Sequence, residues 1–107
     1  MAATVTADPV LMRFRQALED LYGNRLERIV LYGSRARGDA GPESDYDIAV
    51  FLRDMDDRAV ELHRLAALSA RMIGEVGELI HAMPYSQKAY LERTPLMHEI
   101  RREGIDL

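Results

Sequence analysis

The sequence predicts an α+β fold, in which a small mixed β-sheet of about three strands is flanked by helices. Two observations lead to this prediction. Apolar residues recur at helical spacing in several stretches, and short continuous apolar runs, typical of buried strands, lie between these stretches. With 107 residues, 48% of them hydrophobic, the chain has enough apolar material for one small core. We therefore expect one domain over residues 1–107.

The first helix is expected to begin at Asp8-Pro9, because Asp is a favoured N-cap residue and Pro is favoured at the first helical position. Apolar residues then recur at helical spacing as far as Tyr22. Residues 1–7 are mostly small, and we expect them to form a flexible leader before this helix.

Three apolar runs are predicted to be strands. The first is Leu26 to Tyr32 and the second is Tyr46 to Leu52, joined by a loop from Gly38 to Ser44 whose Gly, Pro and acidic residues favour turns. The third is Leu79 to Met83, and we expect Pro84 to end it because proline has no backbone N–H to donate.

A long helix is expected between the second and third strands. Asp54, Asp56 and Asp57 offer side chains that can cap its start, and it is expected to end near Gly74 or Gly77. Two short helices are expected to close the chain, Ser86 to Arg93 and Pro95 to Glu103, with Gly104 as the C-cap of the second.

One pattern carries most of the chemical content. Gly33-Ser34 interrupts the first strand, and Asp45 and Asp47 open the second strand after ten intervening residues. Residues i and i+2 of a strand share a face, so the two carboxylates are expected to lie close enough to hold one or two divalent cations. Two like charges side by side oppose each other's ionisation unless a cation neutralises both. The pattern predicts a metal site, although Asp45 taken alone could be a capping residue.

The Gly-Ser turn predicts a phosphate site next to the metal. It opens a short helical stretch, Ser34 to Arg37, whose free backbone N–H groups and serine hydroxyl can receive phosphate oxygens. Arg35 and Arg37 can contact phosphate or a partner, or remain solvated charges on the turn. A metal on one side and phosphate on the other favour a nucleoside triphosphate as the ligand.

These residues resemble the signature of the minimal nucleotidyltransferases, the MNT-domain proteins of the polymerase β superfamily. The runs GSRARG (33–38) and SDYDIAV (44–50) match the extended form of that signature, and IRREGI (100–105) resembles the usual ending of these small proteins. The resemblance implies a polymerase β-like nucleotidyltransferase fold and Mg²⁺-dependent transfer of AMP from ATP. It also implies the site residues: Asp45 and Asp47 as catalytic metal ligands, and Gly33, Ser34, Arg35, Arg37 and Ser44 as nucleotide-binding residues.

The chain departs from the family at a third carboxylate. Active members carry a further Asp or Glu on the next strand, where it completes the metal site and can act as a base, and the run Leu79 to Met83 contains neither. Glu78, at the edge of this strand, is the best substitute and our candidate third catalytic residue. His81 is expected on the opposite face from Glu78, where a neutral histidine with one hydrogen bond is the ordinary interpretation and contact with metal or substrate is the alternative.

The resemblance also implies a partner. Stand-alone MNT proteins are similar to antitoxins that act with a separate helical HEPN protein and transfer AMP to a tyrosine of that toxin. We therefore expect an antitoxin of this type, encoded near its HEPN partner. The alternative is a catalytically degraded nucleotide-binding subunit that neutralises or scaffolds the HEPN partner by contact alone.

Composition excludes other function classes. A net charge of −4 argues against broad nucleic-acid binding, which needs a basic face, so we expect no direct DNA binding. The chain has no cysteine, which excludes disulfides and thiolate metal sites. Neither a signal peptide nor an apolar run of membrane-spanning length is visible, so we expect a cytoplasmic protein. Self-association stays open.

Overall fold

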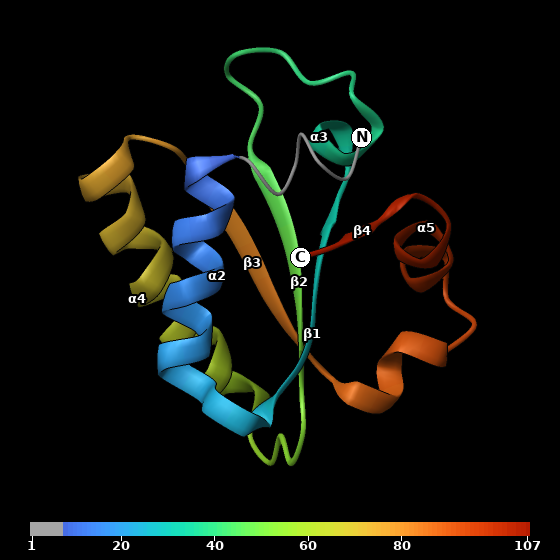
Figure 1. Ribbon diagram of the computed structural model, residues 1–107. Helices are drawn as coiled ribbons and strands as arrows, with labels where there is room; N and C mark the ends of the chain where they lie inside the picture. Colours follow the sequence, from blue (N-terminus) through green and yellow to red (C-terminus); the bar gives the residue numbers. More distant parts are fainter. Residues whose placement is uncertain (1–7) are drawn as a thin grey trace.

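The computed structural model describes residues 8–107, and the proposed leader at 1–7 lies outside the described residues. Four strands form one mixed sheet in the order β3-β2-β1-β4. The sheet stands between two layers of helices (Figure 1). The strands are β1 (Leu26–Tyr32), β2 (Tyr46–Leu52), β3 (Ile80–Ser86) and β4 (Ile105–Asp106). The helices are α2 (Pro9–Tyr22), η1 (Gly23–Arg25), α3 (Ser34–Arg37), α4 (Arg58–Val76), η2 (Gln87–Leu91) and α5 (Pro95–Glu103).

The strand pairing makes the sheet mixed, as predicted. β1 runs antiparallel to both β2 and β4, whereas β2 and β3 are parallel. β2 lies between β1 and β3, and all its residues except Asp47 are buried. A strand that is covered on both faces needs a continuous apolar run, which is what residues 48–52 provide.

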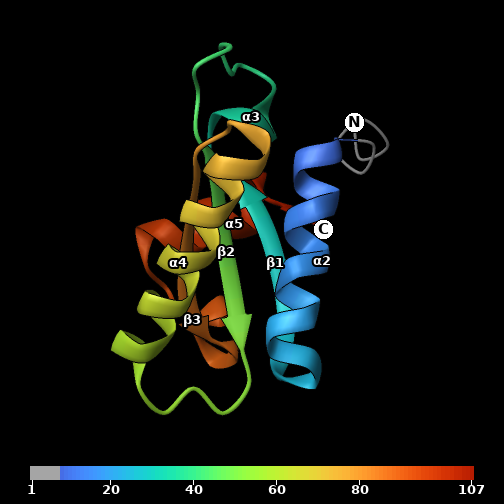
Figure 2. The same ribbon diagram turned by 90° about the vertical axis from the view of Figure 1, so that its left-hand side faces the viewer.

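Two hydrophobic clusters cover the two faces of the sheet. On one face, Ile48 and Val50 of β2 lie in a cluster with buried residues of α2 and α4. On the other face, Ala49 and Phe51 lie in a cluster with buried residues of α5. Figure 2 shows α2 and α4 side by side in front of the sheet, with α5 behind it. Successive residues of β2 therefore face different helical layers, which decides where each polar residue of this strand lies.

The helix caps follow the predicted residues. Asp8 caps α2 by accepting hydrogen bonds from the N–H groups of Val10 and Leu11. Asp57 caps α4 in the same way, and Gly77 ends α4 in the left-handed conformation that glycine adopts most easily. The helix predicted from Pro95 to Glu103 is confirmed, with Gly104 as its C-cap.

Two expectations about the C-terminal third were wrong, and the sheet has one strand that was not predicted. β3 continues through Pro84 to Ser86, because it is an edge strand in which a missing N–H is tolerated. The helix expected from Ser86 to Arg93 is the shorter 3₁₀ helix η2, with the Ser86 hydroxyl as its cap. The sheet has a fourth strand, because Ile105–Asp106 pairs with Leu31 and Val30 of β1.

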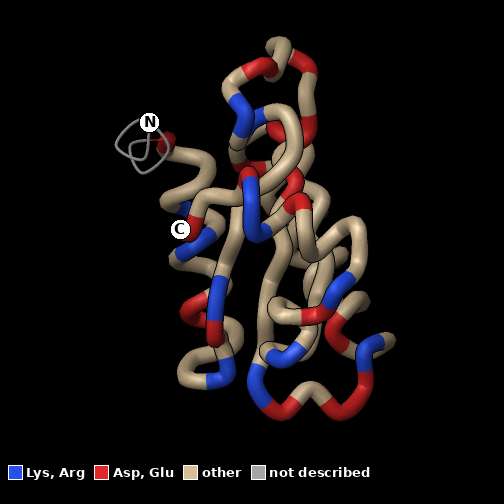
Figure 3. Tube along the Cα trace, turned by 90° about the vertical axis from the view of Figure 1, so that its right-hand side faces the viewer, with Lys and Arg blue, Asp and Glu red and all other residues tan. Residues whose placement is uncertain are grey.

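Charged residues of both signs are spread along the described part of the chain. Figure 3 shows acidic and basic residues interspersed along the described trace. Within residues 8–107, the helices are too short or too polar to cross a membrane.

Candidate functional site

The candidate site lies at the edge of the sheet where β1 ends and where β2 and β3 begin. Gly33 follows the last residue of β1 and is the N-cap of α3 (Figure 1). Asp47 is the second residue of β2, and it pairs with Tyr32 on one side and with His81 on the other. The pairing brings the Gly-Ser turn, an acidic residue and a histidine from three separate segments to one place.

Gly33 packs directly against the carboxylate of Asp47. A Cβ added at Gly33 would lie 2.5 Å from Oδ2 of Asp47, so any other residue would have to displace the acid. The turn also requires φ +75° and ψ −158° at Gly33, a combination that is essentially confined to glycine. The predicted link between the Gly-Ser turn and the second acid is therefore a physical contact.

Asp45 lies one residue before β2 and is exposed, whereas the Asp47 side chain is 33% exposed. Asp45 is thus outside the regular strand on which its shared face with Asp47 was predicted. Within residues 8–107, no three His, Asp or Glu side chains are gathered so that they could hold a metal ion. The metal site of Asp45 and Asp47 remains a prediction.

The donor set nevertheless fits Mg²⁺. Mg²⁺ prefers oxygen ligands, and it is commonly bound by one or two carboxylates while phosphates and water fill the other positions. Asp47 presents its carboxylate at the turn where phosphate was predicted, and the glycine leaves space that a Cβ would fill. Asp45 and Asp47 are the residues that would hold the ion.

Arg35 holds the loop that precedes β2. Its Nε and Nη2 both donate to the carbonyl oxygen of Ser44, at 3.0 and 2.8 Å, and its guanidinium lies 4.0 Å from the centre of the Tyr46 ring. The Tyr46 hydroxyl donates to Asp8 Oδ2 at 2.8 Å. These contacts fix residues 38–44 against the start of β2 and α2, so Arg35 has a clear structural role.

Arg37 and Ser44 also have partners within the protein. Arg37 donates to Asp39 at 3.2 Å and to Glu103 at 3.3 Å, which ties α3 to the end of α5. The Ser44 hydroxyl accepts from the N–H of Gly41 at 3.0 Å. Among the predicted nucleotide-binding residues, Gly33 and Ser34 are therefore the two that form the turn beside Asp47.

The two tyrosines next to the site are neutral near pH 7. Burial raises the pKa of Tyr46 to about 12, and its hydrogen bond to Asp8 acts in the same direction. Burial likewise raises the pKa of Tyr32 to about 12, assisted by the negative charge of Asp47. Neither phenol supplies an anion to the candidate site.

Glu78 and His81 lie on different faces of the sheet. Glu78 Oε2 is 3.9 Å from Arg35 Nη2, in the group around Tyr46 on the side of α2 and α4. His81 Nδ1 is 3.6 Å from Oδ1 of Asp47, on the other side. The structure brings together Gly33, Asp47 and His81, whereas the Glu78 carboxylate lies near Arg35. Sequence reasoning underrated His81 because only the register of the β2–β3 pair shows which residue lies next to Asp47.

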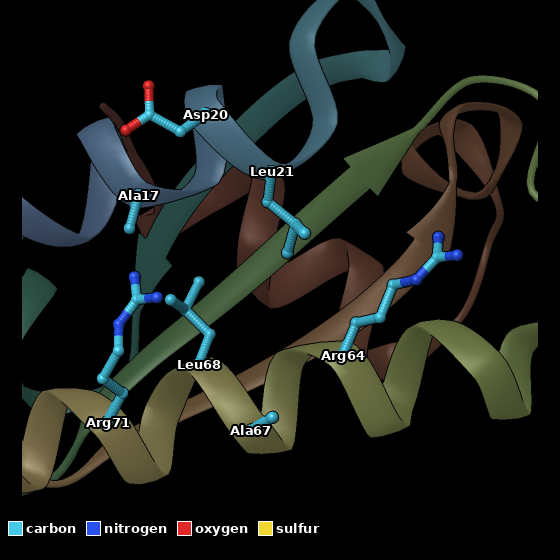
Figure 4. Close-up of a pocket in the computed structure, with 7 residues that line it drawn as sticks. All are labelled: Ala17, Asp20, Leu21, Arg64, Ala67, Leu68 and Arg71. Atoms are coloured by element: carbon cyan, nitrogen blue, oxygen red, sulfur yellow. The ribbon is translucent and has the colours of Figure 1, made fainter.

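A hollow lies between α2 and α4 (Figure 4). These helices cover the face of the sheet opposite to Asp47, so the hollow does not belong to the candidate site. Its lining residues are Ala17, Asp20, Leu21, Arg64, Ala67, Leu68 and Arg71.

Comparison with known proteins identifies the family. Residues 11–100 match the model of the nucleotidyltransferase domain, which covers β1, the Gly-Ser turn, β2 and β3. Two proteins of Methanocaldococcus jannaschii are similar in sequence. "Putative protein adenylyltransferase MJ0141" is 24% identical over 92% of this chain and 95% of its own length. "Putative protein adenylyltransferase MJ0604" is 31% identical over 78% of this chain and 77% of its own length.

The fold is similar to that of a crystallised toxin-antitoxin with AMP-PNP. The TM-score is 0.62 at 20% sequence identity, and the match covers 88% of this chain and 69% of the other. At this level of identity the likeness concerns the fold. The predicted nucleotidyltransferase fold, with its mixed sheet between helices, is confirmed.

Proposed function

The chain belongs to the nucleotidyltransferase domain family, and we propose that it transfers AMP from ATP to a hydroxyl group of a protein acceptor with the help of Mg²⁺. One observation carries the proposal. The Gly33 turn packs against the carboxylate of Asp47, so the turn that would bind phosphate and the acid that would bind metal lie side by side.

Each residue has a role in this reaction. Ser34 and the N–H groups of the turn would bind the terminal phosphates, and Asp45 and Asp47 would hold the Mg²⁺ ion. When bound, Mg²⁺ supplies neutralisation of the charge on the triphosphate and on departing pyrophosphate. The acceptor oxygen forms a bond to the α-phosphorus as the bond to pyrophosphate breaks, and the acceptor proton leaves to water or a nearby base. Most of the rate increase comes from positioning and charge stabilisation.

The acceptor in this proposal is a tyrosine of a separate helical protein, a HEPN-family toxin. Two considerations support it. The sequence relatives carry the name protein adenylyltransferase, and a similar fold occurs in a toxin-antitoxin crystallised with AMP-PNP. The chain would then act as the antitoxin by modifying its partner.

The test uses the purified chain, ATP labelled at the α-phosphate, Mg²⁺ and the purified helical protein encoded next to it. Label should appear on the partner with the wild-type chain and should be absent with Asp47→Asn. The partner's acceptor tyrosine is then located by mass spectrometry, and its replacement by phenylalanine should remove the label.

A second candidate function is a binding subunit that keeps the nucleotide pocket without turnover. The observation that favours it is that, within residues 8–107, no three His, Asp or Glu side chains are gathered so that they could hold a metal ion. This candidate predicts that the chain binds and neutralises the helical partner without transferring label, and that Asp47→Asn neutralises it equally well.

A further inference from the structure

We propose that His81 is a ligand of the metal ion bound at Asp47, and that it shifts the metal preference of the site from Mg²⁺ toward divalent transition-metal ions. This inference rests on the proposed function, because it concerns the metal of the same nucleotide site. His81 is not one of the two predicted metal ligands, Asp45 and Asp47.

Asp47 and His81 lie next to each other on neighbouring strands. Asp47 and His81 are register partners in the parallel pair of β2 and β3, so their side chains leave the same face of neighbouring strands. The Asp47 carboxylate also touches the Gly33 turn, so a ligand of Asp47 has the turn beside it. The Glu78 carboxylate, in contrast, lies near Arg35 on the other face.

The distance between the His81 and Asp47 side chains suits a shared metal ion. The Nδ1 of His81 and Oδ1 of Asp47 are 3.6 Å apart, which is too long for a hydrogen bond. Two neighbouring ligands of an octahedral ion at about 2.1 Å lie about 3.0 Å apart, so a small side-chain adjustment would let one ion contact both atoms. The His81 side chain can make this adjustment, because it is 59% exposed.

The imidazole nitrogen and the carboxylate oxygen differ in the metal ions that they prefer. Imidazole nitrogen is a common ligand of Zn²⁺, Co²⁺ and related ions, whereas Mg²⁺ takes oxygen ligands almost without exception. A site with carboxylate and imidazole donors should thus bind a transition-metal ion more tightly, relative to Mg²⁺, than a site with carboxylates alone. Phosphate oxygens of the nucleotide and water would complete the coordination of either ion.

The test measures coordination directly, with Co²⁺ as the probe and a non-hydrolysable ATP analogue as the nucleotide. Ligation of paramagnetic Co²⁺ by an imidazole moves the ring-proton signals of that histidine far outside their usual NMR range. We expect one histidine to show such signals, both in the wild type with its three histidines and in the control His63→Asn, in which the exposed histidine of α4 is replaced. The signals should be absent in His81→Asp.

The second measurement is the ratio of the Mg²⁺ and Co²⁺ dissociation constants, obtained by calorimetry with the same analogue. His81→Asp replaces the nitrogen donor by oxygen, so this ratio should fall by at least about tenfold, mainly through tighter Mg²⁺ binding. A ratio that is unchanged in His81→Asp, or shifted ring protons that persist in this variant, would overturn the inference.

Neither measurement needs an acceptor or turnover, so the two proposals fail separately. Shifted His81 protons without transfer of AMP to any partner would leave the metal inference standing and overturn the transferase. Transfer of AMP with Mg²⁺, combined with the absence of any His81 contact to Co²⁺, would do the reverse.

Discussion

Gly33 is the residue on which the geometry of the candidate site depends most directly. Gly33→Ala would place a methyl group against Asp47 Oδ2 in a backbone conformation that only glycine adopts easily. We expect a loss of about 2–4 kcal/mol in the free energy of unfolding, together with weaker nucleotide binding. Chemical denaturation and calorimetry with ATP and Mg²⁺ measure the two effects.

Gly23→Ala is the matched control for Gly33→Ala. Gly23 also has a positive φ, +57°, but a Cβ there would have no atom within 4 Å. It should lose about 1–2 kcal/mol through backbone strain alone, and its nucleotide binding should not change. Equal nucleotide affinity in the two variants would show that the contact between Gly33 and Asp47 does not matter for binding.

Asp47 links metal and nucleotide binding to stability. A ligand that binds only the folded chain raises the melting temperature, so ATP with Mg²⁺ should stabilise the wild type. Asp47→Asn should remove most of that increase, while the metal-free variant should be as stable as the wild type or more so, because the negative charge is gone. Melting curves with and without the ligands decide this; an equal increase in both proteins would mean that the nucleotide binds elsewhere.

At the scale of the elements, Glu61 joins α4 to the segment before β1. It is buried, it accepts a hydrogen bond from Arg25 at 2.9 Å, and Arg64 lies 3.3 Å away. Burial alone raises the pKa of Glu61, but the hydrogen bond from Arg25, the Tyr22 hydroxyl and the positive charges of Arg25 and Arg64 together outweigh burial, and the net pKa is lowered. A carboxyl with a lowered folded-state pKa stabilises the fold above its unfolded pKa, about 4.3, and loses this contribution as the pH falls through the folded value.

Glu61→Gln should therefore lower the free energy of unfolding by about 1–3 kcal/mol at pH 7, and the difference from the wild type should shrink below about pH 4. Glu19→Gln is the control, because Glu19 forms an exposed ion pair with Arg15 on α2 and should change stability by less than about 0.5 kcal/mol. Urea denaturation across this pH range measures both. A pH-independent difference for Glu61→Gln would contradict the charge argument.

Elements with strong local signals were predictable from the sequence. Asp8-Pro9 and Asp57 cap their helices as expected, and residues 46–52 form β2 with the predicted bounds. Local signals failed where pairing decides the structure. Pro84 should end a strand by its own chemistry, but at the sheet edge β3 continues through it. Ile105–Asp106 is too short to be predicted as a strand without its partner β1.

The candidate site divides in the same way. The spacing of Gly33 and Asp47 was visible in the sequence, and the structure shows these residues in contact. The neighbour of Asp47 could not be predicted, because a sequence shows which residues of a strand share a face but not which residue of the next strand lies opposite. The register of β2 and β3 places His81 beside Asp47.

For the whole molecule, the sheet divides the polar residues near its edge into two groups. Arg35, Tyr46 and Glu78 lie on the side of α2 and α4, where Tyr46 reaches the cap of α2. Asp47 and His81 lie on the other side. Under the proposed function, metal and nucleotide meet on one side of the sheet, so the two groups would not contribute equally to transfer of AMP.

The last prediction uses this division. Glu78→Gln keeps the shape of the side chain and removes its charge. It should weaken only the ion pair with Arg35, whose N–O distance is long and whose side chains are partly exposed. Nucleotide binding and AMP transfer to the partner should stay within about threefold of the wild type, whereas loss of a general base lowers the rate by a factor on the order of 10² or more. Single-turnover transfer assays distinguish the two cases. A hundredfold loss in Glu78→Gln with unchanged nucleotide affinity would return Glu78 to the role of third acid and would require it to reach across the edge of β2 to the substrate.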